Sequence, residues 1–168
     1  MDLRRIVLGL SLILGLAISQ SVVAQEPSPI VGTWKILTFT AIYVDTNRET
    51  NILGDHPTGF LVYTSGGHVV CWLAGGDRNI PGAPTFTDAE GTELFKTIIA
   101  AYAGTYSVEG DKVIHHIESA WIPAWNGTDQ ARFIERNGNR LKITTPLYPA
   151  GTFAGGSAKF ALTFEKVE

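Results

Sequence analysis

The sequence is poor in cysteine, in clustered basic residues and in long apolar runs, and each shortage excludes a class of protein. Its 168 residues include one cysteine, Cys71, so no disulfide can form within the chain. The 13 Lys and Arg residues are scattered and the formal net charge is −3, which leaves no basic patch of the kind that binds nucleic acid. No apolar run reaches the roughly 20 residues that a membrane-spanning helix needs. The fold must therefore be held by its own core.

The first residues have the three-part order of a cleavable secretory signal. Arg4 and Arg5 give a positive start, an almost wholly apolar run covers Ile6–Ile18, and the small residues Val22 and Ala24 suit the −3 and −1 positions of a cleavage site. We therefore expect a signal peptide over residues 1–24 and a periplasmic or secreted mature protein. No cysteine lies near the cut, so we expect no lipid anchor and no stable membrane anchor.

Removal of residues 1–24 leaves 144 of the 168 residues, which suffices for one domain with its own core. The removed segment holds two basic residues and one acidic residue. The 13 basic and 16 acidic residues therefore become 11 and 15, and the formal net charge becomes −4. We expect residues 30–168 to form a single domain and to behave as a monomer or a weak dimer.

From Ile30 onward, short runs of β-branched and aromatic residues are separated by Gly, Asn and Asp, which is the signature of strands. Ser65-Gly66-Gly67, Glu109-Gly110-Asp111 and Asn137-Gly138-Asn139 are predicted to be hairpin turns. Residues 74–86 are rich in Gly and Pro and are predicted to be a loop. Strands are predicted at residues 32–44, around 62–63, around 70–72, and at 105–108, 112–120, 130–135, 140–145 and 157–167.

One helix is predicted after this loop. Thr87 and Glu90 fit a capping box, in which the side chain of each residue accepts a hydrogen bond from the backbone N–H of the other. Leu94, Phe95, Ile98, Ile99 and Tyr102 recur at helical spacing and give one apolar stripe, which we expect to pack over a barrel opening.

Sequential hairpins make neighbours in sequence neighbours in space. The fold class predicted is all-β: an antiparallel up-and-down β-barrel of about eight strands with one short α-helix. Such a barrel closes its edges and leaves room for side chains or for one small ligand.

Three stretches resemble the bacterial lipocalin-like domain family over roughly residues 30–168. They are Gly32-Thr33-Trp34, the run from Pro57 to Thr64 followed by Gly66, and the second half from Ala103-Gly104-Thr105-Tyr106 through His115-His116-Ile117-Glu118, Pro123, Gly127-Thr128 and Arg132. The resemblance implies a calycin-type barrel and little about activity, because fold does not determine function. It also implies a cation over the Trp34 ring, here from Lys166, worth about 0.5–1 kcal/mol.

The only dense titratable cluster is His115-His116-Ile117-Glu118. Successive strand residues face opposite sides, so His115 lies with Val113 and Ile117, the more apolar face. We expect His115 to point inward, with His116 and Glu118 outward; the converse would place an acid–base pair in the interior. Adjacent strand histidines cannot both bind one metal ion, and we expect no metal and no cofactor.

Aromatic residues supply the other candidate site. We expect a ligand to be lined by Tyr63, Trp72, Tyr106, His115, Trp121 and Trp125, because ligand sites are mostly apolar with a few placed polar groups. Cys71 lies in an apolar run and is expected to be a buried small hydrophobe. Arg132 shares its face with Gln130 and Ile134, and we expect it to point outward.

Three functions remain open from these residues. The favoured one is an exported barrel that binds a small hydrophobic molecule in its interior. The second is a barrel enzyme of the isomerase, cyclase or hydratase type, with His115, His116, Glu118 and Tyr63 as candidate acids and bases. The third is a barrel with a filled core that binds a partner protein. An interior cavity above about 300 Å³ would weaken the third.

Overall fold

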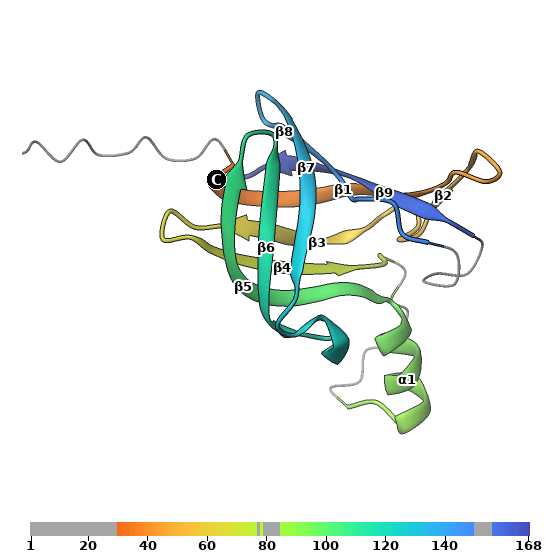
Figure 1. Ribbon diagram of the computed structural model, residues 1–168. Helices are drawn as coiled ribbons and strands as arrows, with labels where there is room; N and C mark the ends of the chain where they lie inside the picture. The colour runs from red at the N-terminus through yellow and green to blue at the C-terminus, as the bar shows by residue number, and fades with distance from the viewer. Residues whose placement is uncertain (1–29, 77, 79–84, 150–155) are drawn as a thin grey trace, which may run out of the picture.

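The computed structural model describes residues 30–76, 78, 85–149 and 156–168. The expected signal peptide and most of the expected loop between Ala74 and Phe86 lie outside these residues. The described part forms nine strands, one α-helix and one 3₁₀ turn (Figure 1). They are β1 (Gly32–Tyr43), β2 (Arg48–Asn51), β3 (Thr58–Tyr63), β4 (His68–Ala74), α1 (Asp88–Lys96), β5 (Ile98–Glu109), β6 (Lys112–Ala120), η1 (Pro123–Trp125), β7 (Asp129–Asn137), β8 (Arg140–Thr144) and β9 (Ala158–Lys166).

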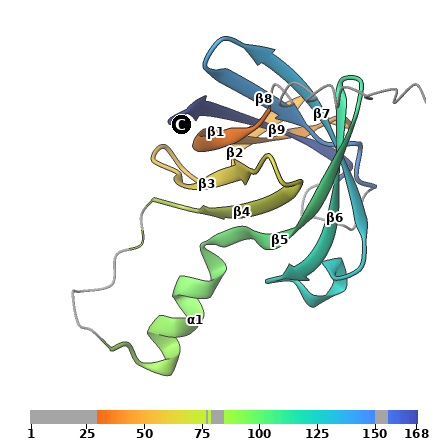
Figure 2. The same cartoon turned by 90° about the vertical axis from the view of Figure 1, so that its left-hand side faces the viewer.

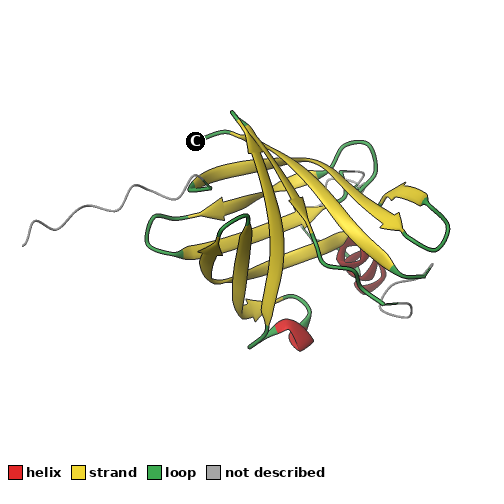
Figure 3. Cartoon of the chain, turned by 45° about the horizontal axis from the view of Figure 1, so that its top comes forward, coloured by secondary structure: helices red, strands yellow, loops and turns green. Residues whose placement is uncertain are grey.

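The strands form one antiparallel sheet in the order β2-β1-β3-β4-β5-β6-β7-β8-β9, and the pairing of β1 with β9 closes it. Figure 3 shows these strands forming the barrel wall. Eight strands make the closed barrel, as the sequence predicts. The ninth, β2, was not predicted; it extends the far half of β1, where Tyr43 pairs with Arg48.

Burial alternates along the strands, as a barrel with a filled interior requires. In β4, Val69, Cys71 and Leu73 are buried, whereas Val70 and Trp72 are exposed. In β6, Val113, His115 and Ile117 are buried. The inner faces of the strands together form one hydrophobic core.

Gly104 allows a sharp bend where β5 meets β6. The register shifts between Ala103 and Gly104, which is a β-bulge. A Cβ atom on Gly104 would lie 2.0 Å from the backbone oxygen of His116, closer than any side chain tolerates. The bulge therefore leaves no room for a side chain at Gly104, which is buried as Tyr102 is.

Helix α1 begins as the sequence predicts and ends earlier. Thr87 is its N-cap, and the capping box with Glu90 is present. The helix ends at Lys96, and Ile98, Ile99 and Tyr102, predicted on its apolar stripe, belong to β5. That prediction is wrong, because residues 98, 100 and 102 also repeat at the two-residue period of a strand and pair with β4. Figures 1 and 2 show α1 projecting beside the start of β5, not lying across the barrel.

The end of the barrel near Trp34 is closed. The Trp34 side chain is fully buried, and its indole N–H donates to the carbonyl oxygen of Ile30 at 2.7 Å. The Lys166 Nζ atom lies 6.0 Å from the ring centroid, which confirms the expected cation, and the Arg136 guanidinium lies 5.9 Å away. Within the described residues, no helix has both the length and the apolar character to cross a membrane.

Candidate ligand-binding site

A hydrogen-bonded chain of side chains crosses the barrel interior at His115. Its Nε2 atom lies 2.7 Å from the Tyr63 hydroxyl, and its Nδ1 atom lies 2.8 Å from the Tyr102 hydroxyl. All three side chains are buried, from three different strands, β3, β5 and β6. The inward orientation predicted for His115 is therefore confirmed.

The imidazole of His115 is neutral in this hydrogen-bonded chain. Burial, then the charge of Arg132, lowers the pKa of His115 well below its ordinary value, so the ring has one donor and one acceptor nitrogen. One of the two tyrosine hydroxyls therefore donates to the ring, and the other accepts from it. Tyr102 also contacts the Cys71 thiol.

Arg132 lies inside the barrel, and the expectation that it points outward is wrong. Its exposed fraction is 8%, whereas Phe133 on the other face is 43% exposed. The register of β6 with β7 is the reason, because it places Arg132 opposite the fully buried Val113 and Gln130 opposite His115. Residues directly opposite in an antiparallel pair lie on the same face. Apolar content on each side of β7 did not reveal this.

A cavity of about 100 Å³ lies in the interior at the end of the barrel remote from Trp34. Its wall is mostly aliphatic and aromatic, and the polar atoms come from Cys71, Tyr102, Arg132, Thr145 and Tyr148. The apolar lining consists of Phe39, Ile52, Leu73, Ile99, Ala100, Ile122, Trp125, Phe160 and Leu162. An apolar wall with a few convergent polar groups is the usual character of a small-molecule site.

A second, more open hollow of about 430 Å³ adjoins the cavity. Trp125, Arg132 and Tyr148 line both spaces and therefore lie between them, and we call these three side chains the neck. The remaining wall of this outer hollow comes from Thr128, Asp129, Gln130, Ala131 and Pro146. The inner cavity is smaller than the 300 Å³ set as a threshold, so its size does not weaken the alternative of a filled barrel.

The predicted lining residues are divided between the two sides of the barrel wall. Trp125 lines the cavity and makes an edge contact with Tyr102, with ring centroids 6.1 Å apart. Trp72 and Trp121 lie on the outer surface, each 42% exposed, so they do not line the interior. Trp72 faces outward because Cys71, its neighbour in β4, faces inward, and Trp121 stacks on Phe95 of α1 at 4.7 Å.

Of the other predicted residues, Tyr63 and His115 lie in the barrel interior, whereas Tyr106 is half-buried. Tyr63 and His115 are buried in the hydrogen-bonded chain and do not contribute to the cavity wall. Tyr106 packs edge-on against Tyr63, with centroids 4.9 Å apart, and its hydroxyl donates to the Thr64 carbonyl oxygen. Tyr102, which the sequence placed on a helix, is the member of the chain that reaches the cavity.

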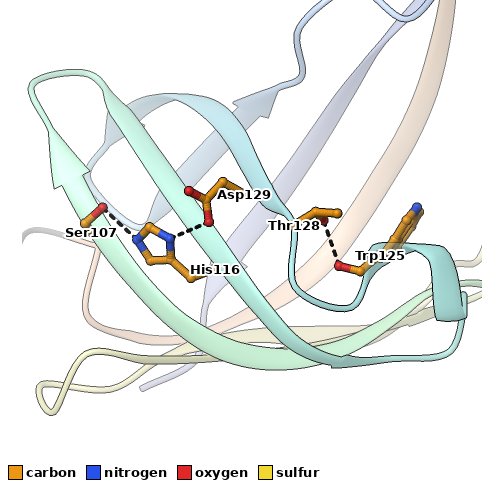
Figure 4. Close-up of polar contacts among 5 residues, drawn as sticks. All are labelled: Ser107, His116, Trp125, Thr128 and Asp129. Carbon is orange, nitrogen blue, oxygen red and sulfur yellow. Dashed lines mark hydrogen bonds and ion pairs between the residues drawn. The ribbon is translucent and has the colours of Figure 1, made fainter.

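The remaining acid–base candidates lie outside the barrel, as expected for His116 and Glu118. The Nε2 atom of His116 lies 3.1 Å from the Ser107 hydroxyl, and its Nδ1 atom lies 2.7 Å from the Asp129 carboxylate (Figure 4). This has the order of a serine–histidine–aspartate triad. The Asp129 side chain is 68% exposed, and neither Ser107 nor His116 lines the cavity or the outer hollow described above. The backbone amides beside these residues are hydrogen-bonded between β5 and β6.

The family model of the lipocalin-like domain matches residues 31–167. The chain belongs to this family. The match covers the whole lipocalin-like barrel from the start of β1 to the end of β9, as the resemblance in the sequence implied. No curated protein matches this lipocalin-like chain.

Proposed function

We propose that this lipocalin-like protein binds a small, mainly apolar molecule within its barrel. The observation that carries the proposal is the interior cavity, whose apolar wall is interrupted by a few polar atoms and which shares Trp125, Arg132 and Tyr148 with the outer hollow. A ligand that occupies both spaces would bury apolar surface against Phe39, Phe160 and Trp125. Burial of apolar surface is the main favourable contribution to such binding.

Adjacent alanines on β5 provide a matched test of the binding position. Ala100 lines the inner cavity, and Ala101 faces the outside of the same strand. The substitution Ala100→Phe fills the cavity, whereas Ala101→Phe adds the same ring to the outer surface. We expect 1-octanol to bind the wild type and Ala101→Phe with one site in calorimetric titrations, and not to bind Ala100→Phe.

Two results would contradict this proposal. One is 1-octanol binding to Ala100→Phe with wild-type affinity, which would place the site elsewhere. The other is an absence of saturable binding to the folded wild type together with an absence of any co-purifying small molecule in native mass spectra. Circular dichroism of each variant controls for folding.

We also propose that residues 1–24 direct export of the chain. The positive start, apolar run and small-residue site support this. Mass spectrometry of the protein recovered from the periplasm or the medium is expected to give a mature chain that begins at Gln25. An uncut N-terminus in the cell interior would contradict the proposal.

A further inference from the structure

The feature that suggests a more specific ligand is the charge of Arg132. The guanidinium of Arg132 is buried, and an arginine side chain keeps its proton far above neutral pH. The side chain is therefore charged at neutral pH. A charge this deeply buried normally has a partner of opposite charge.

Among the described residues, the hydrogen-bond acceptors of this guanidinium are neutral. One Nη atom donates to the carbonyl oxygen of Ala131 at 2.9 Å, and the other donates to the side-chain oxygen of Gln130 at 2.5 Å. These bonds leave further N–H groups of the guanidinium without a protein acceptor in the described ranges. No ion pair involving Arg132 occurs among the described residues.

The titratable neighbours do not compensate the charge either. Burial raises the pKa of Cys71 to about 12 and that of Tyr102 well above its ordinary value, so both groups are neutral at neutral pH. His115 is neutral as well, because its pKa is lowered. The carboxylate on the outer hollow is that of Asp129, and it binds His116 on the outer face of the barrel. Arg132 therefore presents an uncompensated positive charge at the neck.

We propose that the ligand is an amphipathic monocarboxylic acid whose carboxylate binds Arg132 at the neck and whose apolar part fills the inner cavity. This inference rests on the proposed function, because it names the class of ligand for that same site. A guanidinium matches a carboxylate with two parallel hydrogen bonds. A single negative charge balances Arg132, whereas a doubly charged phosphate would leave an excess negative charge beside an apolar wall and near Asp129.

Three probes with one alkyl chain and different head groups test the inference: octanoate, 1-octanol and octylamine, each titrated into the folded protein at pH 7.5. We expect octanoate to bind at least about 10-fold more tightly than 1-octanol, the factor that one charge-assisted hydrogen bond supplies. Octylamine is expected to bind more weakly than 1-octanol, because its cation meets a like charge. Arg132→Met should reduce the preference for octanoate over 1-octanol to within about 2-fold.

Arg140→Met is the matched control, because it removes an equal charge from the outside of the barrel, where Arg140 pairs with Glu165. It should keep the octanoate preference. Arg132→Lys keeps the charge without the two-pronged geometry, and should retain a smaller preference; it also replaces the Met variant if that variant does not fold.

The outcomes separate the two proposals. Equal affinity of the wild type for octanoate and 1-octanol would overturn the carboxylate inference and leave apolar binding in place. An octanoate preference that persists in Arg132→Met would also overturn it. Binding of none of the probes to the folded wild type would reject both the inference and the function on which it rests.

Discussion

A buried charge without a partner should make the unliganded barrel less stable than an uncharged version of itself. The substitution Arg132→Met tests this, because methionine keeps an unbranched, flexible stem and fills the same interior space without a charge. Arg132 is 8% exposed, and its only acceptors in the described part of the chain are the Ala131 carbonyl and the Gln130 amide oxygen. Replacing buried ionic groups by apolar ones of similar volume is often neutral or stabilising by about 1–4 kcal/mol.

We expect the free energy of unfolding of Arg132→Met to exceed that of the wild type by about 1–2 kcal/mol, because the lost hydrogen bonds offset part of the removed desolvation penalty. In a domain of this size, each kcal/mol shifts the melting temperature by about 2–4 °C, so the midpoint should rise by about 2–8 °C.

Urea unfolding and calorimetry of the ligand-free proteins measure this difference, with Arg140→Met expected to change stability by less than about 0.5 kcal/mol. A loss of 1 kcal/mol or more in Arg132→Met would refute the reasoning. It would mean that the neutral acceptors already compensate the guanidinium and that Arg132 serves the fold.

Three further predictions concern groups around the same interior. The folded protein keeps His115 neutral, whereas the unfolded chain protonates it near pH 6.5, so the stability is fully present above that pH and falls on acidification. Urea unfolding should show that the free energy of unfolding falls by about 2 kcal/mol from pH 7 to pH 5. His115→Gln should lack this loss, and the control His68→Gln, at an exposed position, should retain it. An equal loss in His115→Gln would contradict the buried neutral state. The Cys71 thiol, whose pKa burial raises to about 12, should react with Ellman's reagent at pH 8 more than about 100-fold more slowly in the folded protein than in urea, and comparable rates would disprove its burial. Gly104→Ala should lower the free energy of unfolding by more than about 2 kcal/mol, because its Cβ would meet the backbone oxygen of His116; a loss below about 0.5 kcal/mol would show that β5 can move away.

Local patterns in the sequence were sufficient for the features that depend on neighbouring residues. The Asn137-Gly138-Asn139 turn joins β7 to β8, and the Glu109-Gly110-Asp111 turn joins β5 to β6, as predicted. Strand alternation placed His115 inside, because Val113 and Ile117 share its face. These signals act over a few residues and do not depend on the rest of the barrel.

Features that depend on pairing between strands were not accessible in this way. Arg132 shares a face with Gln130 and Ile134, and the opposite face of β7 is no more polar, so only the register with β6 decides which side is buried. Strand β2 (Arg48–Asn51) is exposed and polar throughout, and forms because β1 is long enough to pair with it. The contacts of Tyr102 with His115 and Cys71 likewise join three strands, and nothing in their sequence spacing indicates them.

The end of α1 shows a different limit. Residues 94–102 fit both the helical and the strand period, because Leu94, Ile98 and Tyr102 are four apart and also an even number apart. The pairing of Leu73 with Ala100 in β4 and β5 selects the strand from Ile98 onward. The ambiguity concealed the role of Tyr102 in the site.

The pairing of β1 with β9 has a consequence for the order of folding. The first and last strands of the barrel are hydrogen-bonded along most of their length, Trp34 opposite Lys166 and Tyr43 opposite Ala158. Contacts between such distant segments form slowly, because the intervening chain must first be brought together. The wall cannot close until Ala158–Lys166 is in place, so the edges of β1 and β8 that this strand joins stay unpaired until then. No disulfide can join these two strands, because the sequence has one cysteine, so closure of the wall depends on the hydrogen bonds and packing between β1 and β9.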